Sequence, residues 1–179
     1  MKFFLGIKVS QQSDGIFICQ KKYALEILKR FGMTKSHEVN SLIVPGSKLS
    51  KDADGVAVDE SFYKQIVGSL MYLTSTRPDL VYNVSLINRY MARPIELHVQ
   101  ATKRILRYLK GIFYYGIMYK KRSSNELIAY TDNDYTSDLT DRKSTSGYVF
   151  LLSSGAMSWL SKKHLIVTLP TTEAKFVAV

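Results

Sequence analysis

Two aspartates near the end of a predicted strand are the residues best suited to metal chemistry. Asp132 and Asp134 follow residues 127–131, whose apolar and β-branched side chains predict a β-strand. Alternate strand residues point the same way, so the two carboxylates share a face if pairing continues through Asn133. Such oxygen ligands suit Mg²⁺, and paired ions can activate water for phosphodiester hydrolysis. Aspartates in turns are also ordinary loop formers, and spacing alone favours that simpler interpretation.

A dense group of basic residues is the second candidate site. Residues 97–125 carry seven Lys or Arg and no acid, whereas residues 126–141 carry five acids and no base. Helical spacing places Lys103, Arg107 and Lys110 on one face, which suits a nucleic-acid phosphate backbone. The water-facing side of an amphipathic helix explains the pattern slightly better on composition alone. The candidate nucleic-acid-binding residues are Lys103, Arg104, Arg107, Lys110, Lys120, Lys121 and Arg122.

Composition narrows the class of protein. The chain has 179 residues, 46% of them hydrophobic and 22% charged, which predicts a folded protein rather than a disordered one. A single cysteine excludes an internal disulfide and suits a reducing compartment. The apolar start ends at Lys8, too early for a signal peptide, and we predict no membrane span, so an intracellular location, cytoplasmic or nuclear, is expected. The net charge of +10 favours polyanionic partners, of which nucleic acid is the commonest.

The elements that must position these residues fall into successive groups. Two β-favouring runs, residues 3–9 and 16–19, predict a hairpin, and an amphipathic helix follows that ends near Gly32. Residues 33–58 lack periodicity and contain Pro-Gly and Asp-Gly, which indicates a connecting segment. Three helices are then predicted around residues 62–71, 80–91 and 97–109. Strands are predicted after them at residues 115–119, 127–131, 145–152, 156–160 and 165–169, with a last helix beginning near Thr171.

Seven sequence strings, in order, resemble the Pol polyprotein of copia-type LTR retrotransposons. They are F-F-L-G-I, V-G-S-L-M-Y-L, T-R-P-D-L, K-R-I-L-R-Y-L-K-G, Y-T-D-N-D, D-R-K-S-T-S-G-Y and T-E-A. The resemblance covers essentially the whole chain, and D-R-K-S-T-S-G-Y is its most specific string. It implies an α/β (α+β) fold: an N-terminal β-hairpin and helix, a three-helix connection, and a truncated ribonuclease H-like mixed sheet. The implied parts are the end of the reverse transcriptase palm and thumb (1–40), a linker (41–58), a helical connection (59–122) and a partial ribonuclease H-like domain (123–179).

The resemblance also implies a chemistry, which is Mg²⁺-dependent cleavage of the RNA strand in RNA–DNA hybrids. Asp132 matches the family's first catalytic aspartate and is the implied Mg²⁺ ligand. The family's helix reads T-E-A-E-Y, its second acid matches the catalytic glutamate, and this chain has Lys175 there. An ammonium group at that place repels the ion, and Glu173 lies about 200° away around the helix. We therefore expect an inactive site with no productively bound Mg²⁺, the later family acids falling beyond Val179.

The sequence also bears on three other functions. The family's polymerase motif, Y-V-D-D, does not occur, so we expect no polymerase activity. A non-catalytic nucleic-acid-binding module using the basic residues 103–122 is the main alternative. Residues 104–107 also spell R-x-L-R, which resembles the translocation motif of secreted oomycete effectors. Those proteins carry the motif soon after a signal peptide, so its place inside a predicted helix indicates coincidence.

Overall fold

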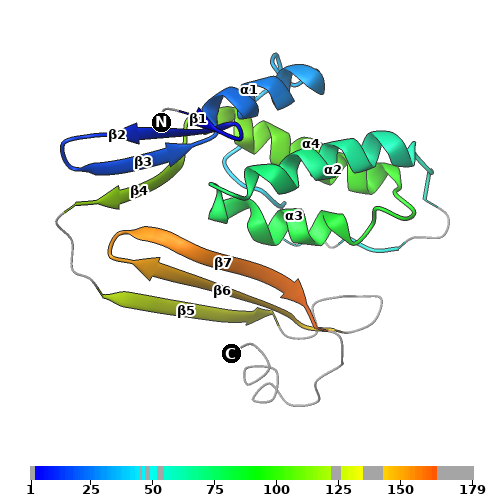
Figure 1. Ribbon diagram of the computed structural model, residues 1–179. Helices are drawn as coiled ribbons and strands as arrows, with labels where there is room; N and C mark the ends of the chain where they lie inside the picture. Colours follow the sequence, from blue (N-terminus) through cyan, green and yellow to red (C-terminus); the bar gives the residue numbers. More distant parts are fainter. Residues whose placement is uncertain are drawn as a thin grey trace.

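The computed structural model describes residues 3–44, 46, 49–51, 55–121, 126–134 and 143–164. The described residues form two antiparallel sheets, of four and three strands, together with a group of helices (Figure 1). This arrangement confirms the predicted mixed α/β fold class. Among the described residues, no helix combines the length and apolar character needed to cross a membrane.

The four-stranded sheet joins the start of the chain to a strand about a hundred residues later. Its strands, in spatial order, are β1 (Phe3–Phe4), β2 (Ile7–Gln11), β3 (Gly15–Cys19) and β4 (Gly116–Lys120). The prediction of one unbroken strand over residues 3–9 is wrong, because Leu5 and Gly6, with φ of 45° and 76°, form a tight turn between β1 and β2. The hairpin predicted from residues 3–9 and 16–19 is confirmed by the pairing of β2 with β3, and β3 pairs on its other side with β4.

The helices share one apolar core. They are α1 (Lys21–Arg30), α2 (Glu60–Leu73), the 3₁₀ helix η1 (Pro78–Leu80), α3 (Val81–Asn88) and α4 (Glu96–Gly111). Asp59 begins α2 by accepting hydrogen bonds from two backbone N–H groups, and Gly32, at φ 68°, follows the end of α1 as predicted. The fully buried side chains of Ile27, Tyr63 and Leu106 come from three different helices and lie in the same cluster. The predicted helices therefore exist and pack together.

The described part of the connecting segment lies against this core. Met33 is buried, and Leu42 and Leu49 pack on the helical cluster while being partly exposed. Near the end of the segment, an isolated antiparallel β-bridge pairs Ala57 with Ile95, the residue before α4. The segment was predicted as a connection without regular elements, and it also contributes apolar side chains to the core.

The three-stranded sheet is a meander of β5 (Leu127–Asp134), β6 (Thr145–Leu152) and β7 (Gly155–Lys163). It is attached to the rest of the molecule by side chains. The Trp159 indole N–H donates to the Thr74 carbonyl at 2.9 Å, and the Tyr119 hydroxyl donates to the Ala156 carbonyl at 2.6 Å. The predicted strand at residues 165–169 and the helix near Thr171, with Glu173 and Lys175, lie outside the described residues.

Candidate functional site

The register of β5 decides how its two aspartates are arranged. Asp132 pairs with Gly147 and Asp134 pairs with Thr145, with Asn133 paired between them. The strand therefore extends past the predicted end at residue 131. Because pairing is unbroken, the two carboxylates project from the same face of the sheet, which is the condition that the sequence left open. The Asp132 side chain is exposed and that of Asp134 is half-buried.

This face of the sheet is turned toward α3. The Tyr82 hydroxyl on α3 donates to Oδ2 of Asp134 at 3.0 Å, and Nη2 of Arg89 donates to Oγ1 of Thr145 at 2.8 Å. A cavity of about 350 Å³ lies between the helix and the sheet, lined among others by Tyr82, Asp132, Asp134, Thr145 and Ser161. The sequence carries no sign of this arrangement, because Tyr82 and Asp134 are 52 residues apart.

The pKa of the Tyr82 hydroxyl reflects the electrostatic environment of this cavity. Burial raises the pKa of its hydroxyl to about 12, and the neighbouring Asp134 carboxylate adds to the effect while Arg89 opposes it. Tyr82 therefore stays protonated and keeps its hydrogen bond to Asp134 at neutral pH. One carboxylate oxygen of Asp134 is thus engaged. Asp132 projects from the same face with its side chain exposed, and its Oδ1 accepts a hydrogen bond from the Asn133 backbone N–H at 2.8 Å.

The donor set partly fits a hard cation such as Mg²⁺. The two carboxylates and the Ser161 hydroxyl offer oxygen ligands, which is the type this ion prefers, whereas the Thr145 hydroxyl already accepts a hydrogen bond from Arg89. Within the described ranges, no group of three or more His, Cys, Asp or Glu side chains is placed to hold a metal ion. Asp132 and Asp134 would hold the ion, and its chemistry would be activation of water toward a phosphodiester. Further ligands are needed for a pair of ions.

The predicted basic residues of α4 are held by the connecting segment. Nε of Arg104 donates to the Ser41 carbonyl at 3.0 Å, and Nε of Arg107 donates to the His37 carbonyl at 2.8 Å. Nζ of Lys110 donates to a third carbonyl of the same segment, that of Ser36, at 2.5 Å. Because carbonyl oxygens carry no net charge, the three cations keep their positive charge while their positions are fixed.

The remaining basic candidates are placed differently. Lys103 is exposed on α4, whereas Lys120 and Lys121 are exposed at the end of β4. In Figure 1 this strand runs away from the helices. Arg122 lies outside the described residues. The structure therefore brings the four α4 candidates together but not the whole basic run that the sequence suggested.

The R-x-L-R string lies inside α4. Its two apolar residues, Ile105 and Leu106, are 2% and 0% exposed, and its two arginines donate to the connecting segment. Each of its four side chains thus has a place in the packing of this fold. A structural role accounts for the string without an export signal.

Known relatives decide the family. The chain is 40% identical over 179 residues to the Retrovirus-related Pol polyprotein from transposon RE1 of Arabidopsis thaliana, a match to all of this chain and 12% of that protein. It is 37% identical over 183 residues to the corresponding polyprotein from transposon TNT 1-94 of Nicotiana tabacum, covering 97% of this chain and 14% of the relative. The chain belongs to the copia-type retrovirus-related Pol polyproteins. The family predicted from the seven strings is confirmed, and this Pol segment spans about an eighth of those relatives' length.

One further relative bears on the effector interpretation. Over 117 residues the Pol segment is 41% identical to the Secreted RxLR effector protein 161 of Plasmopara viticola, covering 65% of this chain and 82% of that protein. The transposon relatives match the whole Pol segment or nearly all of it, so the comparisons do not favour an effector. No family model matches the chain. No solved structure matches it either.

Proposed function

We propose that this Pol segment holds RNA–DNA hybrids and contributes the first strands of a Mg²⁺-dependent nuclease for the RNA strand, and that the chain alone binds the hybrid without cleaving it. The observation that carries this proposal is the register of β5, which puts Asp132 and Asp134 on one face of the β5–β6–β7 sheet. Membership of the Pol family supports the choice of a nucleic-acid substrate.

The carboxylate pair suits phosphodiester hydrolysis but is not sufficient for it. Two ions that stabilise both the attacking and the leaving oxygen need several convergent carboxylates. In the described part of the chain the site offers two, and Tyr82 already engages one oxygen of Asp134. The resemblance matches Lys175 to a further metal ligand, and a cation there opposes ion binding. These features support a site with too little negative charge to bind the metal ions that cleavage requires.

The α4 cations support the hybrid-binding half of the proposal. Lys103 is exposed, while Arg104, Arg107 and Lys110 are partly buried and fixed by backbone carbonyls. Pre-positioned cations lose little side-chain entropy when a phosphate approaches. Each phosphate neutralised releases counterions, so affinity should fall steeply as salt concentration rises.

A cleavage assay tests the nuclease half. The purified chain is incubated with RNA-labelled hybrid and Mg²⁺ beside the Lys175→Glu and Glu173→Gln variants, with Asp132→Asn as the active-site control. We expect no Asp132-dependent cleavage by the native chain. Cleavage that Asp132→Asn abolishes would overturn the expected inactivity, and its loss in Glu173→Gln would assign the metal-binding role to Glu173 instead of residue 175.

A salt series tests the binding half. We expect Lys103→Gln to weaken hybrid binding and to reduce the slope of log affinity against log salt by about one. The matched control is Lys29→Gln, an exposed lysine on α1, which should leave the slope unchanged. Equal effects of both substitutions would show that general net charge, and not the α4 surface, drives binding.

A nucleic-acid-binding module without any nuclease role is the second candidate. The fixed cations of α4 favour it, since they neither require nor contact the β5 carboxylates. It predicts equal affinity for RNA–DNA hybrid and duplex DNA, and no cleavage when Lys175→Glu restores an acid. The nuclease-derived function instead predicts preference for the hybrid.

A further inference from the structure

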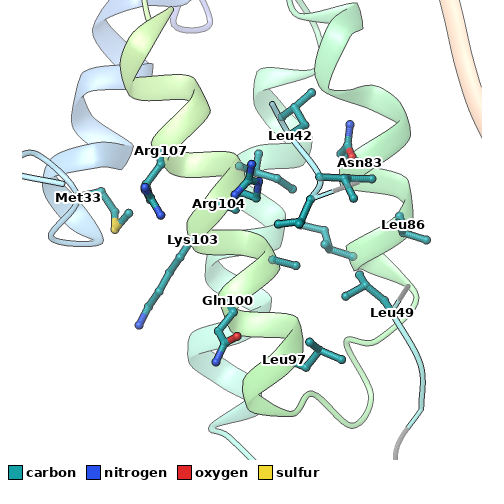
Figure 2. Close-up of a pocket in the computed structure, with 15 residues that line it drawn as sticks. Met33, Leu42, Leu49, Asn83, Leu86, Leu97, Gln100, Lys103, Arg104 and Arg107 are labelled. Carbon is teal, nitrogen blue, oxygen red and sulfur yellow. The ribbon is translucent and has the colours of Figure 1, made fainter. Parts of the chain in front are cut away.

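We propose that a cavity between α3, α4 and the connecting segment binds a small amphipathic anion: an apolar ring or chain that carries one hydrogen-bond donor and one sulfonate, carboxylate or phosphate. The cavity has a volume of about 560 Å³ (Figure 2). That volume is in the range of small-molecule sites. The cavity does not include the β5 carboxylates, but it shares Lys103, Arg104 and Arg107 with the proposed hybrid-binding surface.

The body of the cavity is apolar and mostly aliphatic. Leu86 comes from α3, Leu97 and Ala101 from α4, and Leu42 and Leu49 from the connecting segment. No aromatic side chain is among the described residues that line it, so it lacks the platform on which a nucleobase stacks. The lining therefore favours a compact apolar group over a nucleotide.

One polar atom in this lining lacks a partner. Asn83 on α3 is 7% exposed, and its Oδ1 accepts no hydrogen bond from any described residue. Figure 2 shows it on α3, across the cavity from the basic residues of α4. A buried acceptor without a donor is unfavourable, so a ligand N–H or O–H that reached Asn83 would remove that cost.

The charged residues described at the cavity are all basic. Lys103, Arg104 and Arg107 on α4 line it, and no Asp or Glu is among the lining residues that the structure describes. Arg104 and Arg107 are held in place by the connecting segment, and Lys103 is exposed. An anionic group would be attracted to this side while the apolar body lies between the helices. Apolar volume, a buried acceptor and a cationic side together define the ligand class.

The test uses 1-anilinonaphthalene-8-sulfonate, which has an apolar ring system, one N–H and one sulfonate. Its fluorescence is titrated with the full chain, and thermal unfolding of each variant by circular dichroism verifies folding. We expect saturable binding that weakens about tenfold or more in Ala101→Leu, which fills the cavity, and about two- to fivefold in Lys103→Gln, which removes an exposed charge. The matched Lys29→Gln variant should bind like the native chain.

A displacement experiment separates this site from general dye binding. Naphthalene-2-sulfonate should displace the probe, and the matched cation naphthalene-2-methylammonium should not. Equal displacement by the two, or unchanged binding in folded Ala101→Leu and Lys103→Gln, would overturn the proposal. Lys103 is exposed, so its substitution gives a usable result even if Ala101→Leu fails to fold.

Discussion

The Asp79→Asn substitution should strongly destabilise the helical core, because Asp79 neutralises a buried cation. Arg77 is 3% exposed, and its Nε and Nη2 donate to the two carboxylate oxygens of Asp79 at 2.8 and 2.6 Å. Its Nη1 donates to the Ile112 carbonyl at 3.1 Å, just beyond α4. One guanidinium thus joins the start of η1 to the end of α4, and asparagine would remove the charge that balances it.

The magnitude follows from burial. Removing one partner of a buried ion pair costs about 3–5 kcal/mol. Because the Asp79 side chain is 36% exposed, water compensates in part, and we expect the low end, about 3 kcal/mol. For a chain of this size each kcal/mol lowers the melting temperature by about 2–4 °C, so the expected fall is about 6–12 °C.

Thermal unfolding by circular dichroism at pH 7 measures this fall. The matched control is Glu60→Gln, which breaks the Lys64–Glu60 pair at 2.8 Å, whose side chains are 50% and 52% exposed. That surface pair is worth about 0.5 kcal/mol, so its melting temperature should move by at most about 2 °C. A melting temperature of Asp79→Asn as close to the native value as that of the control would refute the reasoning.

Three further predictions concern other parts of the fold. Burial lowers the pKa of His98, so the unfolding free energy should decline as pH falls below about 6.5, and denaturant titrations should show a flatter pH dependence in His98→Gln. Trp159→Phe removes the hydrogen bond to Thr74, and hydrogen exchange should become faster in β5–β7 but not in α2. In Gly116→Ala the new Cβ would lie 2.1 Å from a β3 carbonyl oxygen and should lower the melting temperature, whereas Gly68→Ala, with open space in α2, should not.

Local patterns predicted most of the elements. The three helices after residue 58 follow the 3.6-residue spacing of their apolar side chains, and α1 ends where Gly32 adopts a positive φ. The strand predicted at residues 145–152 coincides with β6. These features depend on neighbours within one or two turns or one hairpin, and such neighbours are visible in the sequence.

Contacts between distant residues could not be predicted in the same way. β4 pairs with β3. The paired residues that are closest in sequence, Cys19 and Gly116, are still 97 positions apart, and no local pattern indicates that pairing. The alternation of β5 predicted a shared face for Asp132 and Asp134 only on condition of continued pairing, which depends on β6. The hydrogen bond from Tyr82 and the carbonyl partners of the α4 cations likewise depend on tertiary packing.

The most direct test of the central claim follows one RNA-labelled RNA–DNA hybrid through binding and cleavage together. The native chain and Asp132→Asn are incubated with the hybrid and Mg²⁺ at low salt, and each sample is run on a native and a denaturing gel. We predict that both proteins retard the hybrid on the native gel and leave the RNA intact on the denaturing gel. RNA fragments produced by the native chain alone, or a hybrid that neither protein retards, would contradict the claim.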